Sequence, residues 1–118
     1  MAEATAFCPV CGVHVGCVHL HLIHSHGTKP GSEEHRILCK LGRDQTPLDG
    51  VYNCPVREET GCTAITELPT QHLRSFHGHM STDQINRTLR PLRYQVAIKY
   101  LRDLRASGTN LVTSIDLV

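Results

Sequence analysis

The chain has 118 residues, which suits one domain or two very small ones, and only 4% of them are aromatic, with no Trp. Large apolar side chains supply most of the burial energy of a core, so a core this thin needs additional cross-links. A net charge of +1 excludes a strongly basic or acidic chain, and no stretch approaches the roughly 20 apolar residues of a membrane span.

The sequence offers six Cys and nine His for such cross-links, either as disulfides or as ligands of a bound metal. The first residues, MAEATAFC, lack the basic start and the apolar run of a signal peptide. This indicates a reducing compartment, the nucleus or the cytoplasm, where Cys clusters usually bind metal. The interleaved His residues also favour zinc, because a disulfide framework does not need them.

Residues 7–26 contain the first candidate set of metal ligands. Cys8 and Cys11 are followed after nine intervening residues by His21, and after four more by His26. On a helix, a spacing of five is a little over one turn, so both His side chains can face one ion. Twelve intervening residues separate His24 from Cys11, and His24 remains an alternative ligand.

Residues 27–51 are predicted to be a linker that begins with the turn-rich GTKPGS and contains a possible strand at residues 36–39. A third metal site can be drawn from Cys17, His19, His35 and Cys39. The favoured interpretation is different: Cys39 is a small buried hydrophobe and Cys17 an ordinary thiol.

Residues 52–79 repeat the first ligand set. Cys54 and Cys62 are followed after nine intervening residues by His72, and after four more by His77, with His79 as a spare. Zinc in a structural site takes four thiolate or imidazole ligands in a tetrahedron. The sequence therefore predicts two zinc ions, each held by two Cys and two His, and their binding energy becomes folding energy.

These two ligand sets resemble tandem C2H2-type zinc fingers, and the CP…GC opening of the second also resembles TRAF- and SIAH-like fingers. The resemblance covers residues 7–79 and implies a small zinc-stabilised α+β fold with two ββα-like fingers. The nine-residue gaps and the long segment between the fingers depart from base-reading arrays. The rule of three bases per finger is therefore not carried over to this chain.

Residues 81–107 are predicted to form a C-terminal amphipathic helical segment, followed by a tail at residues 108–118. Ser81 with Gln84 forms a capping box, and Gly108 provides a stop. Pro91 either kinks one helix or begins a second. Apolar side chains recur along the segment at helical spacing. They are Ile85, Leu89, Leu92, Val96, Tyr100, Leu101 and Leu104.

Basic charge concentrates in the same segment, since residues 81–118 hold six Lys or Arg against three Asp. Four of these side chains share one side of a straight helix: Arg87, Arg90, Arg102 and Arg105. We therefore expect nucleic-acid binding in gene regulation, mainly through the phosphate backbone of structured RNA or a duplex. The alternative is a zinc-scaffolded protein-interaction adaptor that acts through the helix, including a homodimer through residues 85–104. No motif of a metal-dependent or nucleotide-dependent enzyme is present, so we do not expect an enzyme.

Overall fold

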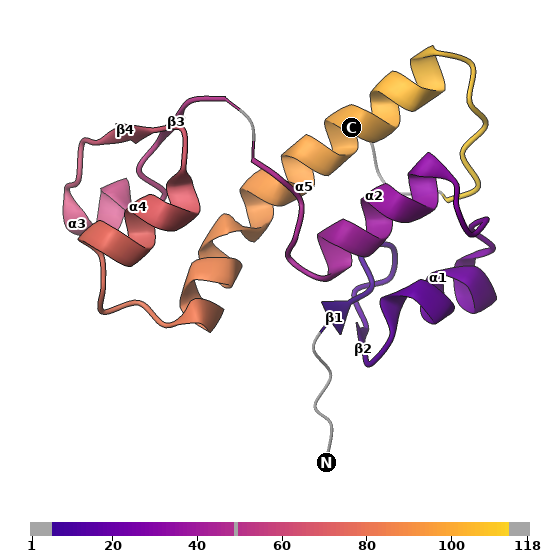
Figure 1. Ribbon diagram of the computed structural model, residues 1–118, viewed down its shortest axis with the longest axis horizontal. Coiled ribbons are helices and arrows are strands. Elements are labelled where there is room, and N and C mark those ends of the chain that lie inside the picture. Colours follow the sequence, from indigo (N-terminus) through magenta and orange to yellow (C-terminus); the bar gives the residue numbers. More distant parts are fainter. Residues whose placement is uncertain (1–5, 49, 114–118) are drawn as a thin grey trace. The chain divides into compact units, whose positions relative to one another are not determined.

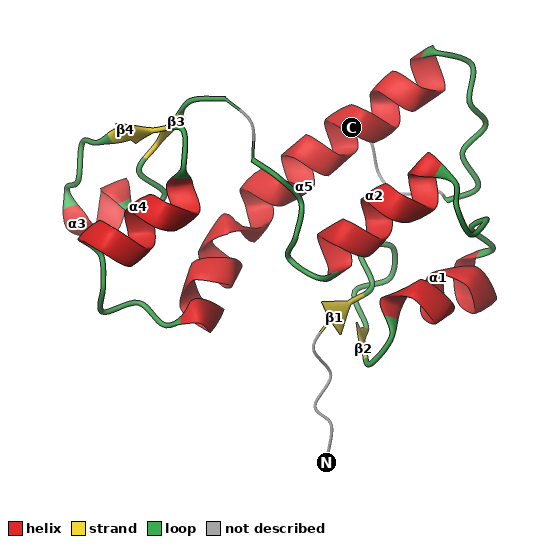
Figure 2. Ribbon diagram, viewed as in Figure 1, coloured by secondary structure: helices red, strands yellow, loops and turns green. Residues whose placement is uncertain are grey.

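The computed structural model describes residues 6–48 and 50–113, which fall into two compact units. The first unit contains residues 6–46 together with 97–113, and the second contains the described residues between 47 and 96. Each unit contains helices and one short hairpin (Figures 1 and 2). The architecture is a small α+β fold, as the sequence predicts.

The first unit begins with a hairpin and a helix. Strand β1 (Ala6–Phe7) pairs antiparallel with β2 (His14–Val15), and helix α1 (Val18–His26) follows. Gly27 ends α1 in the left-handed conformation, with φ of 71° and its N–H bonded to the carbonyl of Ile23. This order of two strands and one helix is that of a ββα unit.

A second helix, α2 (Glu33–Gly42), lies in the segment predicted as a linker, so the possible strand at residues 36–39 is wrong. The Ser32 side chain accepts a hydrogen bond from the His35 N–H at 3.2 Å and caps the helix. Leu38 and Leu41 are fully buried on one face. The cap and the helical spacing of buried residues outweigh the strand propensity of the short apolar run.

Glu34 ties the end of the described chain to α2. Its carboxylate is buried and accepts hydrogen bonds from the backbone N–H groups of Val112, at 3.0 Å, and Thr113, at 2.9 Å, and from the Thr113 hydroxyl. The next residue towards the N-terminus, Glu33, is exposed and makes an ion pair with Arg36. Two adjacent carboxylates therefore have very different roles.

Replacing Glu34 with Ala will destabilise the first unit by about 2–3 kcal/mol, because three donors, two of them buried, lose a charged acceptor. The matched variant Glu33→Ala removes only an exposed ion pair and will cost about 0.5 kcal/mol or less. Denaturant unfolding with bound metal measures both variants. Equal losses would contradict the anchoring role of Glu34.

The second unit repeats the hairpin and helix. Strand β3 (Tyr52–Asn53) pairs antiparallel with β4 (Ile65–Thr66), and helix α4 (Pro69–Phe76) follows. A short helix, α3 (Arg57–Thr60), lies within the long loop between the strands and ends at Gly61. The buried core of this unit is small. It consists of Cys54, Leu73, Ile85 and Leu89.

Helix α5 (Thr82–Ala106) is continuous through Pro91 and contributes residues to both units. The predicted capping box is present, since Ser81 N–H donates to Gln84 Oε1 at 2.8 Å and Gln84 N–H donates to Ser81 Oγ at 3.2 Å. Within the part of the chain that the structure describes, no helix is long and apolar enough to cross a membrane.

The apolar side chains along α5, called here its apolar stripe, are mostly buried or half-buried within the chain. Ile85 and Leu89 are buried in the second unit, and Ala97 and Leu101 in the first. Of the stripe, only Tyr100 is exposed, at 37%. The stripe therefore completes the thin cores more than it offers a surface to a partner.

Candidate metal centres

The first ligand set comes together between the β1–β2 turn and α1. The Cys8 Sγ lies 3.3 Å from His26 Nε2, and the Cys11 Sγ lies 3.5 Å from His21 Nε2. All four ligand atoms lie within 4.8 Å of one another. A turn in which Gly12 N–H donates to the Cys8 carbonyl at 2.7 Å positions the two thiols.

The second set has the same geometry on a longer loop. The Cys54 Sγ lies 3.4 Å from His77 Nε2, and the Cys62 Sγ lies 3.6 Å from His72 Nε2. These four atoms also lie within 4.8 Å of one another. Gly61 has φ of 73°, a conformation that favours glycine, and brings the chain back to Cys62.

These distances fit a tetrahedral ion. Bonds of about 2.3 Å to sulfur and 2.0–2.1 Å to nitrogen place S and N about 3.5 Å apart across a tetrahedral angle. The four measured S–N distances run from 3.3 to 3.6 Å. Each of the two sets can therefore hold a metal ion.

The buried thiol of each set is protonated more readily than an ordinary cysteine. Burial raises the pKa of Cys8, while backbone N–H groups at Cys11 and Val10 counteract part of this effect. Burial likewise raises the pKa of Cys54, opposed by the backbone N–H of Val56. Metal ligation requires thiolates, so an ion must displace these protons, and metal affinity falls as the pH falls.

The two alternative His ligands lie outside the gathered sets. His24 and His79 are both exposed, and neither belongs to a metal-ligand group among the described residues. The His79 ring lies 6.4 Å from the ring of His77, measured between centroids. The two sets of four ligands that the structure brings together are therefore those that the equal spacing predicted.

A third group of ligand atoms is assembled from His19, His35 and Cys39, again within 4.8 Å of one another. The sequence interpretation treated Cys39 as a small hydrophobe. Cys39 is buried, but its Sγ lies 3.4 Å from His35 Nε2, in contact with an imidazole. Two or three Cys/His clusters in this chain can therefore hold a metal ion.

The four arginines proposed from the sequence are divided between the units. Arg87 and Arg90 belong to the second unit, whereas Arg102 and Arg105 belong to the first. Arg87, Arg102 and Arg105 are exposed, and Arg90 is half-buried with a partner of its own. Each unit therefore carries two of the four arginines.

Comparisons of this chain with protein-family models, with characterised proteins and with solved structures found no match.

Proposed function

We propose that the two Cys2His2 centres bind zinc and that the zinc-stabilised chain binds the phosphate backbone of structured RNA or a duplex. Two thiolates and two imidazoles at tetrahedral spacing are the ligand set that zinc prefers. Each set supplies four protein ligands, which leaves no position for a substrate. A stabilising role of these ions is therefore favoured over a catalytic one.

The observation that supports nucleic-acid binding is the charge on the surface of the first unit. The acidic groups of its described residues that are not buried are Glu33, Asp44 and Asp103, because Glu34 is turned inward. Seven basic side chains are exposed in the same unit. They are Lys29, Arg36, Lys40, Arg43, Lys99, Arg102 and Arg105.

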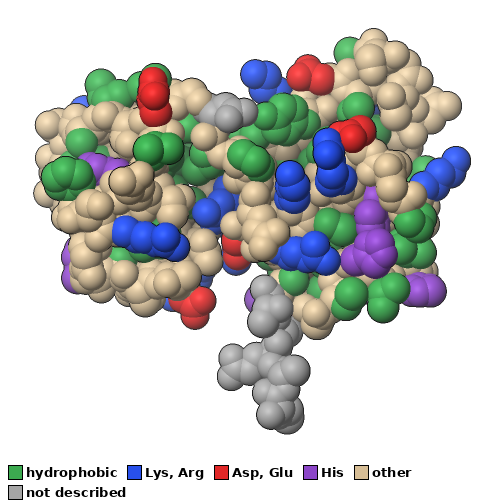
Figure 3. All heavy atoms as spheres, viewed as in Figure 1, with side chains coloured by type: hydrophobic (Ala, Val, Ile, Leu, Met, Phe, Trp, Pro, Cys, Tyr) green, Lys and Arg blue, Asp and Glu red, His purple; other side chains and the backbone are tan. Residues whose placement is uncertain are grey.

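The second unit lacks this excess of basic side chains. Its described and exposed acidic groups are Glu58, Glu59, Glu67 and Asp83. Its exposed basic groups are Arg57, Arg74 and Arg87. Figure 3 shows Lys and Arg side chains spread over the part of one face that carries α2. A phosphate backbone is therefore better matched by the first unit.

Reversing the charge at two sites in α5, with Arg102→Glu and Arg105→Glu together, will weaken binding to duplex RNA or DNA about tenfold or more. The dependence of log K on log salt will become less steep by about 2, one unit for each lost phosphate contact. Fluorescence anisotropy across a salt series measures both effects. It should be run with duplex DNA, duplex RNA and single strands.

The matched control reverses Arg57 and Arg74, two exposed arginines of the second unit, with the same change in net charge. Its affinity should stay close to that of the unmodified chain. Equal weakening by both double variants would mean that binding depends on net charge and is not localised to the first unit. Binding that does not change with salt would contradict a phosphate surface. Arg87→Glu, measured separately, reports on the α5 arginines of the second unit.

A protein partner is the second candidate function, and a different surface supports it. Ile65, Leu68 and Phe76 are exposed at 68%, 60% and 76%, and they line a hollow of about 440 Å³ in the second unit. The zinc ligands Cys62 and His72 lie in the wall of the same hollow. Exposed apolar side chains gathered in one place are typical of interaction surfaces. If no nucleic acid binds, the next measurement is molecular mass against concentration.

A further inference from the structure

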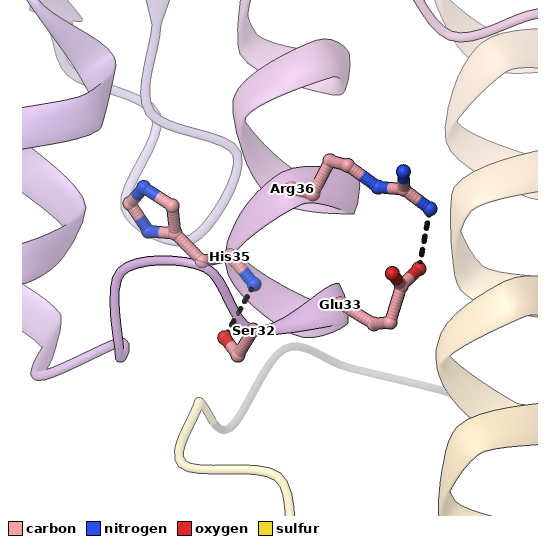
Figure 4. A network of polar contacts seen from close by, with 4 residues as sticks. All are labelled: Ser32, Glu33, His35 and Arg36. Carbon is pink, nitrogen blue, oxygen red and sulfur yellow. Dashed lines mark hydrogen bonds and ion pairs between the residues drawn. The ribbon is translucent and has the colours of Figure 1, made fainter.

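The third Cys/His group lies where α1 and α2 pack against each other in the first unit. His19 is in the first turn of α1, and His35 and Cys39 lie one turn apart on α2. The His35 ring points to the opposite side of α2 from the exposed Arg36–Glu33 pair (Figure 4). Neither of the two centres described above uses any of these three residues.

The buried members of this group are placed as metal ligands. His35 Nε2 lies 3.4 Å from the Cys39 Sγ, close to the roughly 3.5 Å expected between nitrogen and sulfur on one tetrahedral ion. His35 is 4% exposed and Cys39 is 7% exposed. Polar groups buried this deeply need partners, and a metal ion would supply one partner for both.

Thr28 holds the His35 ring in the orientation that a ligand needs. Its Oγ1 lies 2.7 Å from His35 Nδ1, and Thr28 is itself buried at 2% exposure. When Nδ1–H donates to this hydroxyl, the Nε2 lone pair points at Cys39 and His19. Metal-ligating histidines commonly use their second nitrogen in this way.

We propose that Cys17, His19, His35 and Cys39 form a third metal site that ties α1 to α2 in the first unit. Cys17 immediately precedes α1 and is two residues from His19. It completes a set of two thiolates and two imidazoles, the composition of the other two centres. The preferred ion is therefore of the same class, zinc or its tetrahedral substitute cobalt.

Electrostatics around the cluster agree with this arrangement. Burial raises the pKa of Cys39, the Arg43 guanidinium opposes that rise, and the neighbouring Cys17 thiolate adds to it. Burial lowers the pKa of His35, and the charges of His19 and Arg43 lower it further. A neutral His35 is the form that ligates metal.

Two features must change when the metal binds. The exposed Cys17 has to move in, because its Sγ is not among the ligand atoms that lie within 4.8 Å of one another. His35 Nε2 and His19 Nδ1 lie 2.7 Å apart, which is a hydrogen-bond distance, whereas two imidazole nitrogens on one tetrahedral zinc are about 3.3 Å apart. His19 is half-buried, so its ring can move outward by the difference while His35 and Cys39 stay in place.

The test counts metal ions per chain by native mass spectrometry and elemental analysis after reconstitution with zinc alone. We expect three ions in the unmodified chain, and two in His19→Gln and in Cys39→Ser. His24→Gln changes an exposed histidine of the same helix that belongs to no cluster, and it should retain three. His19→Gln is the safer variant for folding, because His19 is less buried than Cys39.

Two ions in the unmodified chain would overturn the third site and leave a hydrogen-bonded His19–His35 pair in its place. If three ions bind, cobalt absorption tests the role of Cys17. The charge-transfer bands from thiolate to cobalt scale with the number of thiolates on the metal. Cys17→Ser should lower these bands and weaken the third ion. Unchanged bands with three ions bound would overturn the assignment of Cys17. These readouts do not involve nucleic acid, so they are independent of the proposed binding function.

Discussion

Stripping the metal from this chain with a chelator at neutral pH will unfold the helices that carry the ligand histidines, α1 and α4. Among the described residues of the second unit, the buried hydrophobic cluster has four members, and one of them, Cys54, is a candidate ligand. Structural zinc contributes about 10–16 kcal/mol of apparent binding energy in small zinc-finger peptides, more than so small a core can supply. Far-UV circular dichroism should lose the helical signal of α1 and α4 and regain it when zinc is returned.

Single ligand variants make this expectation specific to each unit. Cys8→Ser should remove hydrogen-exchange protection from α1, and Cys54→Ser should remove it from α4, because the two ligands lie in different units. Acidification should have the effect of the chelator, since burial raises the pKa of both thiols and protons then compete with the ion. A helical signal that survives complete metal removal would show that the ions do not hold the fold.

Replacing Gly42 with Ala will destabilise the first unit by about 3 kcal/mol, the upper part of the range for overpacked sites. A Cβ at this position would lie 2.4 Å from the Phe7 carbonyl oxygen and 2.9 Å from Val18 Cγ2. The first contact is with backbone, so the strand beside Cys8 would have to move. Alanine normally stabilises a helix relative to glycine, so a large loss here can arise only from this close approach.

Gly16→Ala is the matched control, because Gly16 lies in the same unit, has no atom within 4 Å of the added carbon and does not require a positive φ. It should change the free energy of unfolding by about 0.5 kcal/mol or less. Denaturant unfolding in saturating zinc compares the stability of the two variants. Competition with a zinc chelator measures the affinity of the first centre. A small effect at Gly42 would mean that α2 and β1 are not packed as closely as the structure has them.

The ligand sets could be predicted from the sequence because their spacing is local. His21 and His26 occupy the same positions relative to Cys11 as His72 and His77 do relative to Cys62. One short helix carries the first pair, and a second carries His72 with His77 directly after its last residue. The capping box at Ser81 was equally local and is confirmed. Such features depend on a few neighbouring residues, and tertiary structure does not override them.

Features that depend on packing between distant segments were missed or, as with the third group of ligands, drawn but not favoured. Residues 36–39 resemble a short strand until the Ser32 cap and the buried face of α2 are considered together. His19 and His35 are 16 residues apart in sequence, and only the packing of α1 on α2 brings their rings together. Two acidic neighbours, Glu33 and Glu34, also look equivalent in the sequence although only Glu34 is buried.

The Glu34–Thr113 contact joins residues 79 positions apart, and this separation sets an order of folding during synthesis. The second unit draws on residues 47–96 alone and can assemble once these leave the ribosome. The first unit begins earlier in the chain but needs Ala97, Leu101 and Thr113 to complete its core. We therefore expect the second unit to fold first, and the partly folded first unit to be the segment most exposed to proteases and chaperones in the nascent chain.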